Sequence, residues 1–308
     1  MFMSSGLSVK TAIAEQTEDG MTPAVGWETL PNISNGLNTS TTLTDSELLN
    51  ENRIKSAGMV TGGEISGEIS SELMFGTFDK LISAAFWNEW TVSELDTPSQ
   101  VTIGKKSKFF AVTKDFAEFN AFYLWLGVHV NTMKIEVTTE SIVKVMFGLM
   151  GLGYETQKTK SFATSPTAAV EKGKASGHSI GDILVDDAPI GVCVEAFSIE
   201  LNNQAEIQKC LGKNLYGGSI HALIASITGA LTLEFSEKSY DILEMQRTGT
   251  TMSLVVPIEF EDGSIYELTL PQIQIEGDIP APSGSGLVKA EVTYKVVNKS
   301  PILKRIEA

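Results

Sequence analysis

Residues 60–73 read Val-Thr-Gly-Gly-Glu-Ile-Ser-Gly-Glu-Ile-Ser-Ser-Glu-Leu, and the alternation in this segment is the clearest indication of the fold class. One parity carries Glu64, Glu68 and Glu72 with two serines between them, and the other parity is mostly apolar. Because successive side chains of a strand point to opposite faces, the pattern predicts a long strand with one acidic face in water and one face on a core. Residues 76–86 then change to the spacing of apolar side chains that predicts a helix.

The strand and the helix occur twice in the sequence. Residues 65–73 align without a gap with residues 227–235, so that Ile65 meets Ile227, 162 positions later. The helical stretch 78–81 meets residues 240–243 at the same separation. A strand, a gap and a helix that agree together predict a duplicated unit.

Two further matches extend the repeat over most of the chain. Residues 133–136 resemble residues 273–276 at a separation of 140, and residues 33–38 resemble residues 197–202 more loosely. We therefore expect a mainly β protein of two tandem domains, each built from packed antiparallel sheets as a sandwich or half-barrel with one flanking α-helix.

Composition shifts suggest where the domains begin and end. We expect an N-terminal arm at 1–25, a first domain at 26–155 and a second domain at 182–308. Residues 156–181 carry lysines among Ser, Thr, Ala and Gly, which predicts an exposed linker.

Two shorter segments also carry predictions. Residues 39–55 are polar and short of core residues, so a long loop is expected there. Residues 90–104 alternate weakly around Asp96-Thr97-Pro98, which predicts a hairpin.

Composition bounds the class of protein. The chain has 308 residues, of which 42% are hydrophobic, and this fits a folded chain and not a disordered one. Its net charge of −15 argues against a protein that grips nucleic acid, because phosphate contacts need Lys and Arg. An acidic surface past which DNA slides is not excluded. No apolar run reaches membrane-spanning length and residues 1–10 lack the features of a signal peptide, so we expect folding in a cytoplasm and no membrane partner.

The residues that could carry enzyme chemistry are scattered. His129, His178 and His221 show no metal-ligand spacing, and His129 is expected to pack inside an apolar strand. Cys193 and Cys210 are too few for a zinc site and are expected to be small apolar residues in strands. We expect no catalytic residue, no metal and no cofactor. An enzyme that depends on His129 remains the rival class, and a loss of turnover on changing His129 would support it.

A third class is a ligand- or glycan-binding β-sandwich module of a phage or bacterial surface structure. Trp87 and Trp90 lie near expected loops, where exposed aromatic rings could bind a sugar. The end of a helix beside a hairpin would equally suit packing of these rings.

The order of several segments resembles the major tail tube proteins of long, flexible-tailed (siphovirus-type) bacteriophages. The order of these segments along the chain carries the resemblance, and no single motif does. The second half follows through the internal repeat and through residues 183–187, which lead into 197–199. In the first half the segments are 14–24, 26–30, 60–65, 72–81, 108–110, 115–116, 127–131 and 145–148.

The resemblance implies a structural protein of the virion tail, assembled in the bacterial host cytoplasm. Family rings hold six domain copies, so a chain with two copies implies a homotrimeric ring of pseudo-sixfold symmetry, with a hexamer as the alternative. Rings would stack into a tube, bridged by the N-terminal arm and long loops. Further expected partners are the tape-measure, tail terminator and distal tail proteins, with double-stranded DNA passing through transiently.

In such a tube the acidic strand face gains a role. Carboxylates repel phosphates, so a lumen lined with them would let DNA pass without holding it. The alternative is that these carboxylates face the outer solvent. The residues expected to line the lumen are Glu64, Glu68, Glu72, Glu136, Glu234 and Glu276.

Overall fold

The computed structural model describes residues 6–18, 20–48, 54–92, 97–212, 214–280 and 285–308. Within these residues strands predominate and two α-helices occur, which confirms the mainly β, antiparallel prediction. In the same residues no helix has the length and apolar character needed to cross a membrane.

A central sheet begins in the first half of the chain with four antiparallel strands. Their spatial order is β4 (Asn38–Thr44), β5 (Met59–Glu72), β9 (Lys144–Gly151) and β8 (Ala121–Thr138). The short β3 (Ser34–Asn35) precedes β4 and also pairs with β5.

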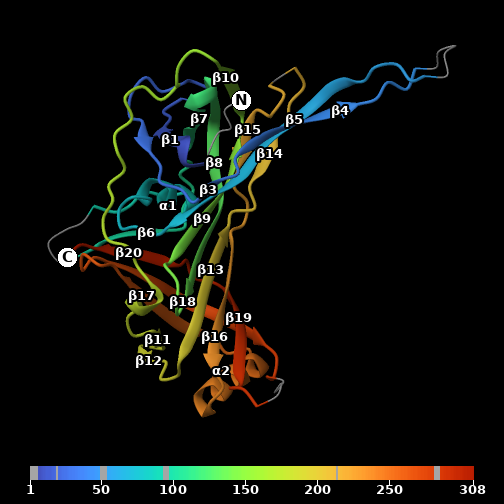
Figure 1. Ribbon diagram of the computed structural model, residues 1–308. Helices are drawn as coiled ribbons and strands as arrows, with labels where there is room; N and C mark the ends of the chain where they lie inside the picture. Colours follow the sequence, from blue (N-terminus) through green and yellow to red (C-terminus); the bar gives the residue numbers. More distant parts are fainter. Residues whose placement is uncertain (1–5, 19, 49–53, 93–96, 213, 281–284) are drawn as a thin grey trace.

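The second half repeats this order. Its strands are β13 (Val194–Asn202), β16 (Ser226–Glu234), β19 (Lys289–Val296) and β18 (Ile265–Gly277). Because β8 pairs with β13, the two sets of four join edge to edge into one sheet of eight antiparallel strands (Figure 1).

One α-helix follows the equivalent strand in each half. α1 (Asp79–Ala85) follows β5 and packs on β8, and α2 (Glu237–Thr248) follows β16 and packs on β18. The side chain of Ser236 accepts a hydrogen bond from Ser239 N at the start of α2, and Gly249 ends that helix with φ of 64°. Leu81 and Leu243, which the sequence repeat aligns, are both buried.

A second layer of strands covers the apolar face of each half. In the first half it contains β1 (Val9–Glu15), β2 (Glu28–Thr29), β7 (Phe110–Phe116) and β10 (Gly153–Gln157), which pair with one another or with the first part of β8. In the second half it contains β17 (Met252–Glu259), β20 (Ile302–Ile306), β11 (Leu184–Val185), β12 (Ala188–Pro189) and β6 (Ser99–Thr102). A continuous core of buried apolar side chains runs beneath both halves.

The loop predicted at 39–55 is wrong over residues 39–44. These residues form most of β4 and pair with β5 as a two-stranded ribbon that projects from the body (Figure 1). β-Branched threonines favour extended backbone even where little apolar area is buried, so a lack of apolar residues does not exclude a strand. The small hairpin β14 (Glu206–Gln208) and β15 (Ser219–His221) occupies the equivalent place in the second half.

The hairpin predicted at 90–104 is only partly right. Thr91 N donates a hydrogen bond to Gln100 O at 2.9 Å, whereas β6 itself pairs with β20 near the end of the chain. Residues 93–96 lie outside the described residues. A strand from the first half therefore completes a sheet of the second half, a long-range pairing that local alternation does not reveal.

The segments expected as an arm and a linker are held against the body. β1 pairs along its length with β7, and residues 12–14 are buried. Within 156–181, Thr167 N donates to Trp27 O at 2.9 Å, and the buried Ala175 accepts a hydrogen bond from Val143 N at 2.9 Å.

The register of hydrogen bonds corrects two of the sequence alignments. Ser34 lies opposite Ser70 and Ala196 lies opposite Thr232, so β3 and β13 are related by 162 residues, two fewer than the sequence match suggested. A shift by an even number keeps every side chain on its face, so alternation fixes the face of a strand without fixing its register.

The second correction concerns β8 and β18. Lys144 and Lys289 occupy equivalent places, opposite Glu72 and Glu234, which are themselves 162 residues apart. Four residues further on, Gly148 faces Thr132, while its counterpart Thr293 faces Glu276. Thr132 and Glu276 are thus equivalent, and the separation of β8 and β18 is 144 residues, not 140.

Candidate functional site

The candidate site is the face of the central sheet that points away from both helices, which we call the polar face. Residues directly opposite each other on antiparallel strands point to the same side of a sheet. One row of such residues crosses seven strands and contains three of the predicted carboxylates. From β5 to β18 it runs Glu72, Lys144, Glu136, Ser198, Ala230, Thr293 and Glu276.

The other three predicted carboxylates share this face. Glu64 and Glu68 have the parity of Glu72 on β5 and are exposed. Glu234 has the parity of Ala230 on β16 and is exposed too. On the opposite parity Ile65, Ile69 and Leu73 are buried in the core. The structure thus brings all six predicted residues to one face of one sheet.

Lysines also lie on the polar face, and the sequence analysis missed their contribution. Among the described residues, eight carboxylates and four lysines project from the strands there, which leaves a formal charge of −4 on this face. The regular alternation of charged and apolar residues in 132–138 and 289–295 is the signal that would have found four of the six residues not predicted. The residues not predicted are Lys134, Lys144, Glu200, Lys289, Glu291 and Lys295.

Ion pairs neutralise part of this charge locally. Lys134 lies 2.6 Å from Glu136 and Lys295 lies 2.9 Å from Glu276, while Lys289 pairs with Glu195 at the edge of the face. The hydrogen bond to Glu136 raises the pKa of Lys134, as do the charges of Glu136, Glu200 and Glu68, against partial burial that lowers it. Exposed pairs of this kind contribute at most about 1 kcal/mol each, so they shape the field of the face more than its stability.

Among the described residues, five carboxylates of the polar face form no salt bridge. They are Glu64, Glu68, Glu200, Glu234 and Glu291. Two of these five carboxylates, Glu64 and Glu68, lie on β5. Among the described carboxylates of that strand only Glu72 forms an ion pair, with Lys174 at 2.5 Å.

A shallow hollow of about 340 Å³ lies in the middle of the polar face. Polar and charged side chains of β8, β13, β16, β18 and β19 line it, among them Lys134, Glu200 and Lys295. On the opposite, apolar face of the same strands, Gly229 makes room for the buried ring of Tyr294, whose hydroxyl donates to Ser198 O at 2.9 Å. An open, polar hollow of this shape differs from the enclosed apolar pockets that bind small ligands.

The residues considered for an enzyme or for a sugar-binding module pack within the protein. His129 is buried, with its ring nitrogens 2.9 Å from Gly127 O and 3.0 Å from Ser107 Oγ, which confirms the packing prediction. Trp87 is buried, and Trp90 Nε1 donates to Asp79 O at 2.9 Å, so neither ring is displayed for a sugar.

The cysteine prediction is wrong. Cys193 and Cys210 are free and exposed, and both lie just outside strands. A cysteine is usually buried, but Cys193 lies just before β13 and Cys210 just after β14, at positions exposed to solvent. Within the described residues no group of three or more His, Cys, Asp or Glu side chains is placed to bind a metal ion.

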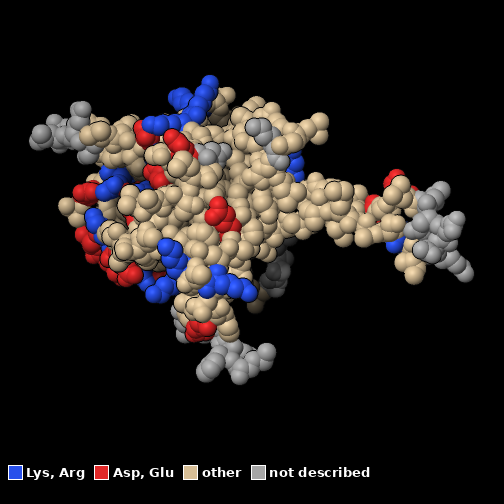
Figure 2. Space-filling view, turned by 90° about the horizontal axis from the view of Figure 1, so that it is seen from above, with Lys and Arg blue, Asp and Glu red and all other residues tan. Residues whose placement is uncertain are grey.

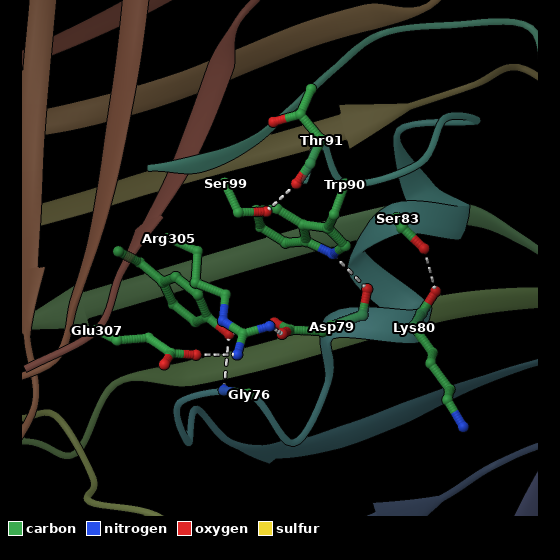
Figure 3. A network of polar contacts seen from close by, with 10 residues as sticks. Gly76, Asp79, Lys80, Ser83, Trp90, Thr91, Ser99, Arg305 and Glu307 are labelled. Atoms are coloured by element: carbon green, nitrogen blue, oxygen red, sulfur yellow. Dashed lines mark hydrogen bonds and ion pairs between the residues drawn. The ribbon is translucent and has the colours of Figure 1, made fainter. Parts of the chain in front are cut away.

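A separate polar cluster joins the two halves of the chain, and we call it the junction cluster (Figure 3). Asp79 of α1 accepts hydrogen bonds from the Tyr266 hydroxyl on β18 and from Arg305 Nη1 on β20. Gly76 N donates to the same tyrosine oxygen at 2.8 Å. Burial raises the pKa of Asp79, although Tyr266 and Arg305 oppose that shift by stabilising the carboxylate.

Charge is distributed unevenly over the molecular surface. Figure 2 shows Lys and Arg side chains next to Asp and Glu over the body of the protein, whereas the stem of the β4–β5 ribbon is free of charge. Residues 38–44 and 59–63 contain no ionisable side chain.

Comparison with known proteins gives one family. A protein-family model described as a phage tail tube protein matches residues 6–296. Comparison with curated proteins gives no match.

Proposed function

The chain belongs to the phage tail tube protein family, and from that premise we propose that three copies close into a ring whose polar face lines a bore for DNA. As a member of this family it is a structural component of the phage tail that assembles into a tube with other tail proteins. The observation that carries the proposal is the eight-stranded sheet with a duplicated strand order and one uncovered polar face.

The strand count fits a closed ring. Three chains supply 24 strands, which at about 4.8 Å spacing and about 40° tilt form a barrel with a backbone radius of roughly 24 Å. Side chains would leave a bore of roughly 35–40 Å, wide enough for a duplex about 20 Å across. Closure would also pair the two strand edges at the ends of the sheet.

The space inside the barrel supports the polar face as the lining of the bore. α1, α2 and the second layer of strands all cover the apolar face. Helices alone are about 10 Å across, so these layers inside the barrel would narrow the bore of roughly 35–40 Å to roughly 15–20 Å, too narrow for a duplex about 20 Å across. The polar face with Glu64, Glu68, Glu72, Glu136, Glu234 and Glu276 therefore turns inward.

The charge of that face suits passage of DNA. Carboxylates offer phosphates no counterion release, so the duplex gains nothing by binding. With a Debye length of about 8 Å at physiological salt, repulsion acts close to the wall and keeps the duplex central. The lysines reduce this repulsion, and the unpaired carboxylates of β5 contribute most to it.

The remaining parts of the proposal concern assembly. The uncharged stem of the β4–β5 ribbon (residues 38–44 and 59–63) would contact the next ring of a stack, and the tape-measure, tail terminator and distal tail proteins would bind inside the tube and at its ends. Assembly would take place in the bacterial host cytoplasm. We also propose domain boundaries at 26–155 and 182–308, with 156–181 as the connection and 1–25 preceding the first domain.

Electron microscopy of the assembled protein tests the ring. Views along the axis should show three chains with six similar lobes around an open bore, whereas six chains in a ring would overturn the trimer.

Replacing Glu64, Glu68 and Glu72 by Lys tests the bore. We expect tubes to form and DNA delivery to fall, with Gln at the same positions as the control, and unchanged delivery by the Lys variant would contradict the assignment.

A further inference from the structure

The central sheet has an open edge at each end, on β4 and at the end of β18. Inside the chain the equivalent edges pair with each other, because β13 is the counterpart of β4 and β8 is the counterpart of β18. In that internal junction Ala196 lies opposite Thr138 and Asn202 lies opposite Thr132. Among the described residues no strand pairs with either open edge.

Along β4, side chains make the hydrogen bonds to backbone groups that a neighbouring strand would otherwise make. Gly36 N donates to Glu68 O on β5 at 2.7 Å, so the backbone groups of the alternate residues Leu37 and Thr39 point outward. Leu37 N donates to Asn35 Oδ1 at 3.0 Å, and Thr39 N donates to Asn38 Oδ1 at 2.8 Å. Both donors are thus capped by asparagine side chains close to them in sequence.

The outward carbonyl of this edge is capped as well. Lys114 Nζ donates to Leu37 O at 2.8 Å, and its ammonium group lies 5.3 Å from the centre of the Trp125 ring. Burial of the ammonium group in this position lowers the pKa of Lys114.

The end of β18 shows the same arrangement. Val297 N donates to Gln272 O, so the odd-numbered residues of β18 point their backbone groups toward the open edge. There Gly277 N donates to Gln246 Oε1 of α2 at 2.9 Å. The counterpart of Gly277 is Met133, which lies opposite Leu201 in the internal junction.

The exposure of an isoleucine indicates that this edge lacks a neighbouring strand. Ile279 has the parity of the buried Ile273 and Ile275, yet 72% of its surface is exposed. Its counterpart, Ile135, is 3% exposed because β13 lies beside it. A strand beside Ile279 would bury its side chain in the same way.

We propose that the open edge of β4 binds the end of β18 on a second copy of the chain, in the register of the internal junction. The correspondence places Leu37 opposite Ile279, Asn38 opposite Asp278 and Thr39 opposite Gly277. The caps from Asn35, Asn38, Lys114 and Gln246 give way to backbone hydrogen bonds as the copies dock. This inference rests on the proposed ring and defines its subunit contact.

A proline agrees with this register. Pro280 lies opposite Gly36 and has the parity whose N–H does not point to the open edge, so its missing donor costs nothing there. The proline therefore does not obstruct hydrogen bonding along this edge. Asn38 and Ser40 also meet Asp278 and Glu276 without bringing like charges together.

Disulfide trapping tests the register. Asn38→Cys with Asp278→Cys joins a non-hydrogen-bonded pair, whose Cβ atoms lie close enough for a disulfide. Cys193 and Cys210 are first replaced by Ser. The matched control is Thr42→Cys with Asp278→Cys, four residues out of register. Lys134→Cys with Glu200→Cys, the equivalent pair inside the chain, shows how readily this geometry oxidises.

The readout is a non-reducing gel of oxidised protein beside electron micrographs of the same sample. We expect the in-register pair to yield covalent oligomers at least tenfold more abundantly than the Thr42 control. Tubes without that difference would overturn the register and leave the ring intact. A lack of any tube or ring in the cysteine-free background would overturn the ring and this contact together.

Discussion

Arg305 Nη1 lies 2.6 Å from Asp79 Oδ2, and this ion pair joins residues 226 positions apart in the sequence. Both side chains are largely buried, and Arg305 also lies 5.4 Å from the centre of the Phe75 ring. The pair ties the helix of the first half to the last strand of the second half, at a place where the two halves could otherwise move apart.

Replacing Arg305 by Met should weaken the fold. The change leaves the Asp79 carboxylate buried without its cationic partner, and we expect a loss of about 2–4 kcal/mol in the free energy of unfolding, somewhat below the range for fully buried pairs. Urea denaturation measures it. Arg247→Met, which removes only the exposed pair with Glu244, should change stability by less than about 1 kcal/mol. Equal effects of the two variants would contradict the structural role of the junction cluster.

The junction cluster should also make stability depend on pH. Burial raises the folded-state pKa of Asp79 above 3.8, so the folded chain holds this proton more tightly than the unfolded chain. The contribution of Asp79 is therefore fully present below pH 3.8 and is lost as the pH rises through the raised pKa. Relative to Asp79→Asn, the wild-type free energy of unfolding should fall with rising pH in that window. Parallel curves for the two proteins would show that the pKa is not raised.

Ile279 should matter for assembly and not for the fold of a single chain. Because its side chain is mostly exposed, Ile279→Asp should leave the thermal unfolding midpoint of the unassembled protein nearly unchanged. Tube formation, followed by light scattering, should fall at least tenfold, while Ile279→Val assembles normally. The same change at the buried counterpart, Ile135→Asp, should unfold the protein. Normal assembly of Ile279→Asp would argue against the proposed contact.

The asparagine cap on β4 should slow docking. Asn38→Ala leaves Thr39 N without its side-chain acceptor, so the edge is more readily offered to another copy. We expect a shorter lag before tubes appear, by a few-fold, in turbidity measurements at matched protein concentration. Ser40→Ala, on the same strand and face, removes no cap and serves as the control. A lag unchanged or lengthened by Asn38→Ala would count against displacement of the caps.

Gly229 should tolerate no side chain. A Cβ atom there would lie 2.3 Å from Tyr294 Oη and 2.2 Å from Ser198 O, so Gly229→Ala should cost about 1–3 kcal/mol through overpacking. Chemical denaturation gives the value. Gly286→Ala meets nothing within 4 Å and should be close to neutral. A neutral Gly229→Ala would mean that Tyr294 can move aside without loss.

Alternation of side chains made much of this fold predictable. Glu64, Glu68 and Glu72 point away from the core as their parity predicts, and the helices follow the strands that the repeat identifies. Alternation did not fix the alignment of the sequence of β18 with that of its counterpart β8, because a shift of four residues leaves every side chain on the same face. β6 was misjudged for another reason, since its partner β20 is about 200 residues away.

The position of the candidate site could be predicted from the sequence, but the distribution of charge on it could be predicted only in part. The spacing of the carboxylates on one parity predicts an acidic face, whereas nothing in that spacing assigns Lys134 and Lys295 to the same face. Their ion pairs with Glu136 and Glu276 depend on which residues of neighbouring strands come together. That information resides in the pairing of strands far apart in sequence, and no single stretch contains it.

The placement of β6 limits how far the two halves of the chain can be separated. Residues 99–102 belong to the first half of the sequence but form the outermost strand beside β20. A second half expressed alone would lack this strand and would expose the edge of β20. The two halves are therefore not interchangeable modules.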